Sequence, residues 1–294
     1  MKFACIKAEK ANFPVRMMCR LLEVSSSGFY AWLKRGRSTR ALEDQRLALE
    51  VAEVHLRSRR RYGSPRVHRE LQARGIRIGR KRVARLMYLQ RLAARPKRRI
   101  RRTTDSTHTK APAPNLLGRN FVATAPDRVW VTDITYIWTK EGWLYLAAVI
   151  DLFSRRVVGW AVSERIDAAL CWQAMRNALL SRRPAPGLIL HSDRGGQFVS
   201  KDFVKLAEEH GVVQSMSRKG DCWDNAVAES FNGTIKAELI EEEEFATRAQ
   251  CKRALFEYIE GFYNSSRLHS YLGACCGIRT NTSTGWGGRD LLGA

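Results

Sequence analysis

The sequence predicts an α/β domain with a mixed five-stranded sheet and flanking helices, preceded by an all-helical region that carries the excess positive charge. From Met1 to Lys110 there are 30 Lys and Arg against 8 Asp and Glu, whereas from Ala111 onward each group numbers 21. Apolar residues follow helical spacing in the first third, and strand-like alternation begins only after residue 120. We therefore expect a helical region over 1–94, a linker over 95–120, a sheet domain over 121–273 and a divergent, disordered tail over 274–294.

The first helical pair begins near Pro14, a residue that suits the first position of a helix. Apolar residues follow as far as Leu22, and Ser25 is a good N-cap for a second helix that carries Phe29 and Trp32. Two helices joined by a tight turn form a helix-turn-helix, whose second helix enters the major groove of DNA. A plain helical core would show the same spacing, so the basic excess is the observation that favours DNA binding.

A second helical pair follows a longer helix over Leu42–Leu56. Ser64-Pro65 predicts the start of the next helix, and Gly75 predicts its end. The last helix, around Val83, carries cations on its first turns, where they suit contacts with DNA phosphates. A solvated charged face is the alternative. The predicted DNA-binding cations are Arg80, Lys81, Arg82 and Arg85.

Composition excludes several classes of protein. No stretch approaches the roughly 18 apolar residues of a membrane helix, and the start of the chain is too charged for a signal peptide. The seven cysteines form no CxxC pair. We therefore expect a reduced, cytoplasmic protein without structural zinc or disulfides. The stretch 95–120 is first cationic and then rich in Thr, Ser and Pro, which is typical of a linker.

The sheet domain opens with three strands, of which the first two are joined by a short turn that predicts a hairpin. Shorter apolar strands then alternate with helices. This order fits a ribonuclease-H-like fold. The predicted strands are Val129–Trp138, Trp143–Ile150, Arg156–Val162, Leu188–Leu190 and Val212–Met216. The predicted helices are Ala168–Leu180, Lys201–His210, Trp223–Leu239 and Ala249–Tyr263.

Three acidic residues stand at positions that suit a metal site. Asp133 lies in the middle of a strand on the same face as apolar neighbours, where a carboxylate needs a hydrogen bond, a counter-charge or a cation. Asp193 follows the short strand Leu188–Leu190, at the sheet edge where ligands of α/β proteins commonly bind. Glu229 lies on a helix. Each acid alone has an ordinary explanation as a turn, cap or surface residue.

The helix with Glu229 has a polar stripe, because Asn225, Glu229, Asn232 and Lys236 are spaced by four, three and four residues. Between Asp193 and Glu229 lie 35 residues. This spacing, with Lys236 two helical turns further on, makes the acidic set specific. Because the three acids lie on three different elements, they can converge only when the chain folds.

Several motifs resemble the second-frame product (OrfB) of transposases of the insertion sequence 3 family, relatives of retroviral integrases. The resemblance runs from about Phe3 to Gly273. It implies that Asp133, Asp193 and Glu229 form a catalytic, metal-binding triad of the DDE type, and that Lys236 holds DNA near it. The motifs are Val131-Thr132-Asp133-Ile134-Thr135-Tyr136, His191-Ser192-Asp193-Arg194-Gly195-Gly196-Gln197 and Asp224-Asn225-Ala226 with Ala228-Glu229-Ser230-Phe231.

The resemblance also implies an activity, a cofactor and partners. The activity is DNA cleavage and strand transfer at the ends of an insertion sequence, with two Mg²⁺ or Mn²⁺ ions held by carboxylates. The partners are double-stranded DNA, a first-frame (OrfA) protein or frameshift fusion, and further copies of the chain on DNA, in the bacterial cytoplasm near the nucleoid. Asn225 and Asn232 share the stripe of Lys236 and are predicted to contact DNA. His191 shapes the site or packs passively, and Asp151 is the rival carboxylate, interpreted as structural.

Two positions depart from the family pattern. Glu23 stands where the family has Gly in the turn of the first helix-turn-helix, which would cost about 1 kcal/mol if the backbone there is left-handed. After Leu272-Gly273 the family's Tyr and Ser/Thr-Pro segment is absent, which indicates a shifted reading frame or a degenerate copy. The altered tail makes a catalytically inactive DNA-binding remnant one alternative function, and a nuclease of the same fold without strand transfer is another.

Overall fold

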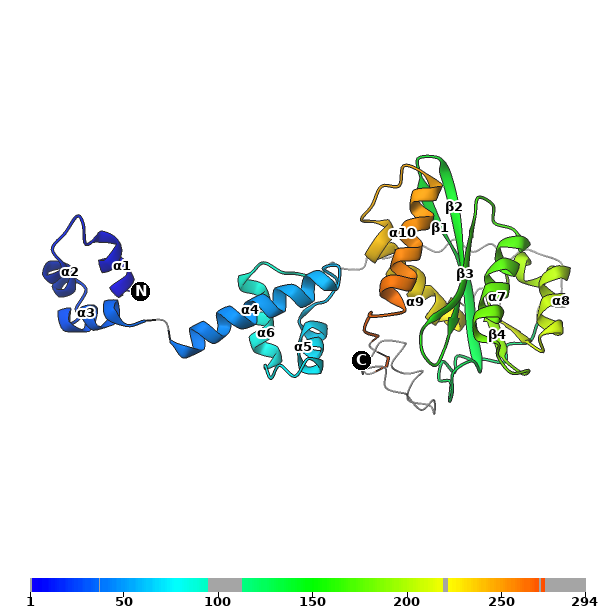
Figure 1. Cartoon of the computed structure of the whole chain (residues 1–294), viewed down its shortest axis with the longest axis horizontal. Coiled ribbons are helices and arrows are strands. Elements are labelled where there is room, and N and C mark those ends of the chain that lie inside the picture. The colour runs from blue at the N-terminus through cyan, green and yellow to red at the C-terminus, as the bar shows by residue number, and fades with distance from the viewer. Residues whose placement is uncertain (1, 37, 95–112, 219–221, 270, 273–294) are drawn as a thin grey trace, which may run out of the picture.

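In the computed structural model the described chain forms three bodies in a row, two helical and one built on a sheet (Figure 1). Within the described residues no helix is long and apolar enough to span a membrane. The predicted tail and most of the predicted linker lie outside the described residues, and the domain boundaries stay predictions. The structure describes residues 2–36, 38–94, 113–218, 222–269 and 271–272.

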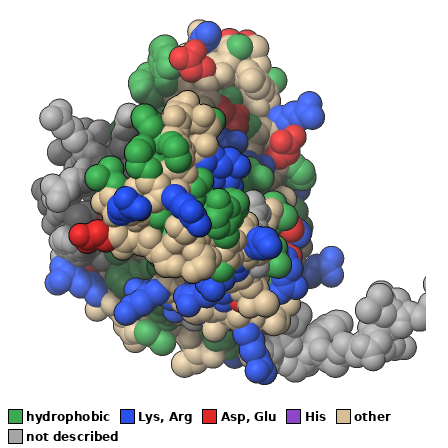
Figure 2. All heavy atoms as spheres, turned by 90° about the vertical axis from the view of Figure 1, so that its left-hand side faces the viewer, with side chains coloured by type: hydrophobic (Ala, Val, Ile, Leu, Met, Phe, Trp, Pro, Cys, Tyr) green, Lys and Arg blue, Asp and Glu red, His purple; other side chains and the backbone are tan. Residues whose placement is uncertain are grey.

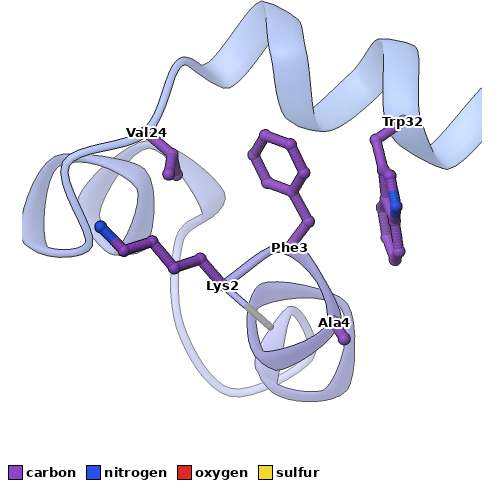
Figure 3. A pocket seen from close by; sticks show the side chains of 5 residues that line it. All are labelled: Lys2, Phe3, Ala4, Val24 and Trp32. Atoms are coloured by element: carbon purple, nitrogen blue, oxygen red, sulfur yellow. The ribbon is translucent and has the colours of Figure 1, made fainter.

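The first body contains α1 (Lys2–Glu9), α2 (Val15–Leu21) and α3 (Ser26–Lys34). Ser25 caps α3 as predicted, because its hydroxyl accepts a hydrogen bond from the backbone of Gly28 at 3.2 Å. Phe3 and Trp32, whose rings lie 5.8 Å apart, line a small hollow between α1 and α3 (Figure 3). The turn after α2 has a left-handed residue, Glu23, with a φ of 52°. The position where the family pattern has Gly therefore does require a positive φ.

The second body contains α4 (Thr39–Arg57), α5 (Ser64–Ala73) and α6 (Arg80–Leu89). Its core is formed by apolar residues from all three helices, and Leu268 from the far end of the chain completes it. The buried members contributed by the helices include Leu47, Val51, Val67, Leu71 and Val83.

The third body is built on one mixed sheet with the strand order β3-β2-β1-β4-β5. The strands β1, β2 and β3 pair in antiparallel fashion, whereas β4 runs parallel to β1 and to β5. The ribonuclease-H-like arrangement predicted from the sequence is confirmed. The strands are β1 (Val129–Thr139), β2 (Gly142–Asp151), β3 (Val157–Ser163), β4 (Ile189–Ser192) and β5 (Val213–Met216).

Helices cover both faces of this sheet (Figure 1). One face packs on α7 (Ala168–Arg182) and α8 (Lys201–Glu209), and the other on α9 (Ala226–Ile235) and α10 (Arg248–Tyr258). Contact between α7 and β3 is so close that a Cβ on Gly159 would lie 2.4 Å from the backbone nitrogen of Ala178. The glycine therefore sets the distance between α7 and the sheet.

Two predicted helices are irregular at their ends. A short 3₁₀ turn, η2 (Cys222–Asn225), precedes α9, and a π-helical turn, η3 (Lys236–Ile240), continues it. A second π turn, η4 (Ile259–Tyr263), continues α10, and a 3₁₀ turn, η1 (Gly196–Val199), follows β4. Single-turn π segments are often found at functional sites.

Candidate active site

Asp133 lies in β1 just beyond the ladder with β4, which pairs β1 only from Val129 to Val131. One carboxylate oxygen of Asp133 accepts a hydrogen bond from the backbone nitrogen of Ile134 at 2.9 Å. The other accepts one from the side-chain amide of Asn232 on α9, at 3.0 Å. The carboxylate therefore points to the face of the sheet that α9 covers.

Asp193 directly follows β4, in the turn that leads to η1. Its Oδ1 accepts a hydrogen bond from the backbone nitrogen of Gly195 at 3.0 Å. A Cβ on Gly195 would lie 3.0 Å from that oxygen and 2.5 Å from the side-chain oxygen of Gln197. Only glycine fits this turn without a shift. Because β1 and β4 are parallel neighbours, the turn places Asp193 beside the middle of β1.

Glu229 lies in the first turn of α9 and is exposed. Burial, the charge of Asp193 and, more weakly, the charge of Glu229 raise the pKa of Asp133 to about 7, while the Ile134 and Asn232 hydrogen bonds oppose this rise. The three predicted acids therefore lie near enough for their charges to repel. Such mutual repulsion is what a bound cation would relieve.

The donor set fits a divalent cation in its chemistry, since carboxylate oxygens are the hard ligands that Mg²⁺ prefers. Within the described ranges, however, no three His, Cys, Asp or Glu side chains are gathered closely enough to hold an ion. The three carboxylates therefore act on one another through their charges but are not gathered into a set of ion ligands in this structure.

The rest of the predicted polar stripe makes contacts within the protein. Asn225 is buried and donates its amide to the carbonyl oxygen of Thr132 at 3.0 Å, while its own Oδ1 is buried and has no hydrogen-bond partner among the residues that the structure describes. Asn232 is held by Asp133. The ammonium of Lys236 lies 4.1 Å from the centre of the Tyr136 ring. The predicted DNA contacts of these residues stay predictions.

The predicted cations of α6 divide into two pairs. Arg82 and Arg85 both bond to Asp44 on α4, and Arg82 also contacts Glu43 at 2.7 Å. Arg80 and Lys81 are exposed. Seen from the end of the molecule where α1–α3 lie, Lys and Arg side chains are spread over the surface and few acidic ones are visible (Figure 2). This distribution matches the charge imbalance of the sequence.

A buried carboxylate that the sequence did not single out, Asp224, lies at the start of α9. It accepts hydrogen bonds from Arg218, Arg119 and Asn115 at 2.9–3.1 Å, and the Arg218 bonds hold its pKa far below the ordinary value. Its place beside Asn225 in the motif was the available signal. Asp224 ties the segment before the sheet to the start of the helix that carries Glu229.

Asp151 and His191 have structural surroundings. Asp151 is fully buried and accepts hydrogen bonds from the backbones of Asp127 and Ser154 and from the Ser154 hydroxyl. The His191 ring is buried between the hydroxyls of Ser215 and Ser217, and burial lowers its pKa to about 4. The structure thus supports a structural interpretation of Asp151 and a neutral, packed imidazole at His191.

Comparisons with known proteins match the sheet domain and the second helical body. Two family profiles described as "Integrase core domain" match residues 123–222 and 210–276, and one described as "HTH-like domain" matches 42–99. The "Insertion element IS600 uncharacterized 31 kDa protein" of Shigella sonnei is 46% identical over 256 residues, which cover 87% of this chain and 94% of that protein.

A second relative is the "Transposase InsF for insertion sequence IS3A" of Escherichia coli strain K12. It is 41% identical over 275 residues, which cover 93% of this chain and 96% of that protein. Among solved structures, the catalytic core domain of HTLV-2 integrase in complex with magnesium covers 54% of this chain and 98% of its own length. The TM-score is 0.41 and the identity is 18%.

Proposed function

Because the chain belongs to the IS3 family of transposases and has an integrase core with an HTH-like domain, we propose that it cleaves and joins DNA at the ends of an insertion sequence. Asp133, Asp193 and Glu229 are the proposed acidic triad. One observation carries this assignment. Asn232, three residues after Glu229 on α9, donates a hydrogen bond to Asp133 at 3.0 Å, and β4 pairs with β1 just before Asp133, which supports the convergence of three acids from β1, the end of β4 and α9.

The cofactor that we propose is a pair of Mg²⁺ or Mn²⁺ ions held by these carboxylates. When bound, such ions activate the attacking hydroxyl and stabilise the leaving oxygen of a phosphodiester. The protein's own part is to orient the ligands. Asn232 fixes one oxygen of Asp133, and the backbone of Gly195 fixes one oxygen of Asp193. Glu229, exposed in the first turn of α9, would supply the third carboxylate.

The proposed DNA partner is bound by the basic helices. Arg80 and Lys81 are exposed in the first turn of α6, so they suit phosphate contacts, whereas Arg82 and Arg85 would exchange their contacts with α4 for DNA. Lys236 would hold DNA beside the triad, with its position set by the ring of Tyr136. A first-frame partner and further copies of the chain on DNA complete the proposal.

The test incubates the full chain with a labelled duplex of the element end, a target duplex and Mg²⁺. We expect joined products from the wild type, and none from Asp193→Asn, which should still bind the end duplex. Asp202→Asn is the matched control, because Asp202 is exposed on α8. Undiminished joining by Asp193→Asn would refute the triad. If the wild-type chain nicks the end duplex without joining it, the protein is a nuclease. If the wild-type chain only binds the duplex, it is an inactive remnant.

A further inference from the structure

The turn between α4 and α5 inserts an arginine into the sheet domain. Arg61 is buried, and its guanidinium reaches the end of what we call the Glu229 helix, which is α9 with its π extension η3 (226–240). One terminal nitrogen donates to the carbonyl oxygen of Ala237 and to the carboxylate of Glu242, each at 3.1 Å. The other donates to the carbonyl oxygen of Glu238 at 2.5 Å.

These two carbonyls belong to the last turn of the Glu229 helix. Carbonyls at a helix C-terminus lack partners within the helix, and the negative end of the helix dipole attracts a cation. The forked guanidinium of Arg61 supplies both the hydrogen bonds and the charge. Arg61 therefore caps this helix from another body of the protein, next to Lys236 and about 12 Å along the helix from Glu229.

A second contact joins the same two bodies. The hydroxyl of Tyr62 accepts a hydrogen bond from the backbone nitrogen of Leu268 at 2.7 Å, and donates one to the carbonyl oxygen of Ser266 at 3.3 Å. The side chain of Leu268 lies in the core of the second helical body. Beside it, Arg267 forms two hydrogen bonds with the carboxylate of Glu238, at 2.7 and 3.0 Å. The Glu229 helix is thus held at its end by a continuous set of buried polar contacts.

The backbone of the turn between α4 and α5 is strained at the two residues that precede Arg61. Two successive non-glycine residues, Arg59 and Arg60, have φ values of 53° and 60°. The guanidinium of Arg59 lies 5.9 Å from the ring centre of Tyr258 and 5.7 Å from that of Phe262. Strained residues persist where the surrounding contacts hold them, and such strain is often found at functional positions.

We propose that Arg61 is a positioning residue for strand transfer. It fixes the end of the Glu229 helix to the HTH-like domain, so that the domain carrying the α6 cations also sets the positions of Lys236 and Glu229. The inference rests on the proposed function. The contact made by Arg61 thereby fixes the position of DNA bound to α6 relative to the acidic triad.

The test compares single-turnover joining by the full chain at saturating end duplex, together with the Kd of that duplex. Arg61→Gln is expected to slow joining by about 10- to 100-fold, the range for a small misplacement of reacting groups, with the Kd within about twofold. Arg61→Lys should recover part of the rate, because it keeps the cation and loses the fork. Arg60→Gln is the matched control, since Arg60 is the exposed neighbour in the same turn.

The proposal would be overturned if Arg61→Gln joins DNA at a rate within about twofold of that of Arg60→Gln, because the rate is expected to fall by much more than this. Tyr62→Phe keeps the ring and removes only the hydroxyl, so it decides the question if Arg61→Gln fails to fold. Tyr62→Phe should also slow joining at an unchanged Kd. An unchanged rate would overturn the proposal that this contact positions the Glu229 helix.

Hydrogen exchange needs no catalysis, so it separates this inference from the proposed function. Amides over 236–242 should exchange faster in Arg61→Gln than in Arg60→Gln, because the end of the helix loses its cap. Equal exchange would overturn the inference even if joining proves to need Asp193. Faster exchange in Arg61→Gln together with undiminished joining by Asp193→Asn would instead reject the triad and support the contact between Arg61 and the Glu229 helix.

Discussion

The buried ion pair between Glu238 and Arg267 gives a stability prediction whose magnitude follows from its surroundings. The two side chains are 8% and 5% exposed, and they share two hydrogen bonds. Glu238 also accepts a bond from the Tyr258 hydroxyl at 2.7 Å. If Arg267 is replaced by Met, the carboxylate stays buried with one neutral donor. Breaking one side of such a pair destabilises a protein by about 3–5 kcal/mol.

The reciprocal change, Glu238→Gln, leaves the guanidinium buried without a counter-charge and should be destabilising to the same order, about 3–5 kcal/mol. The double variant Glu238→Leu with Arg267→Met removes both charges together. Since apolar replacement of a whole buried pair is often neutral, the double variant should be more stable than either single variant.

Urea unfolding of each variant, followed by fluorescence of the eight tryptophans, measures these differences in the free energy of unfolding. Arg253→Met is the control, because Arg253 forms an exposed pair with Glu257 on α10, where the loss should be below about 1 kcal/mol. The reasoning fails if the single variants lose no more than this control, or if the losses in the double variant simply add.

Three further outcomes are expected from unfolding measurements. Glu23→Gly should stabilise the chain by about 1 kcal/mol, because φ there is 52°, and a loss of stability would contradict the strain. Gly159→Ala should destabilise it by more than about 1 kcal/mol, since the new Cβ meets Ala178 at 2.4 Å; an unchanged urea midpoint would show that α7 can move away. Burial, and then the charge of Arg267, lower the pKa of His269 to about 3, so the folded state keeps this ring neutral while the unfolded chain protonates near pH 6.5. The contribution of the neutral His269 ring to the free energy of unfolding is therefore full above pH 6.5. It is lost as the pH falls toward 3, and the loss is about 2 kcal/mol at pH 5. A His269→Gln variant whose stability falls with pH as steeply as that of the wild type would argue against this.

Local patterns in the sequence were enough to predict the sheet. Alternating side chains located β1 to within one residue, and Ser25 marked the start of α3, because strand alternation and N-caps are properties of neighbouring residues. The glycine of the family pattern raised the question whether the backbone at Glu23 is left-handed, and its φ of 52° answers it. The predicted helix over Trp223–Leu239 was too regular, since neither the 3₁₀ turn before α9 nor its π-helical end has a local signature.

Contacts between distant parts of the chain could not be predicted in this way. Asp224 is an unremarkable acid in the sequence, and its partners Arg119 and Arg218 are recognisable only once the sheet has formed. Arg61 is one of three consecutive arginines, so nothing in the sequence separates the buried member from its exposed neighbours. The triad could be predicted as a set because its spacing matches a family, and its roles stay a proposal.

The contact between Tyr62 and Leu268 has a consequence for synthesis of the chain. The two residues are 206 positions apart, yet Leu268 completes the core of the second helical body. At 5–20 residues per second, a ribosome needs roughly 10–40 s to pass from one to the other. During that time α4, α5 and α6 have an open core. A product that terminates before Leu268 keeps its basic helices but lacks the side chain that completes their core, so we expect α4, α5 and α6 to be less stable in it than in the full chain.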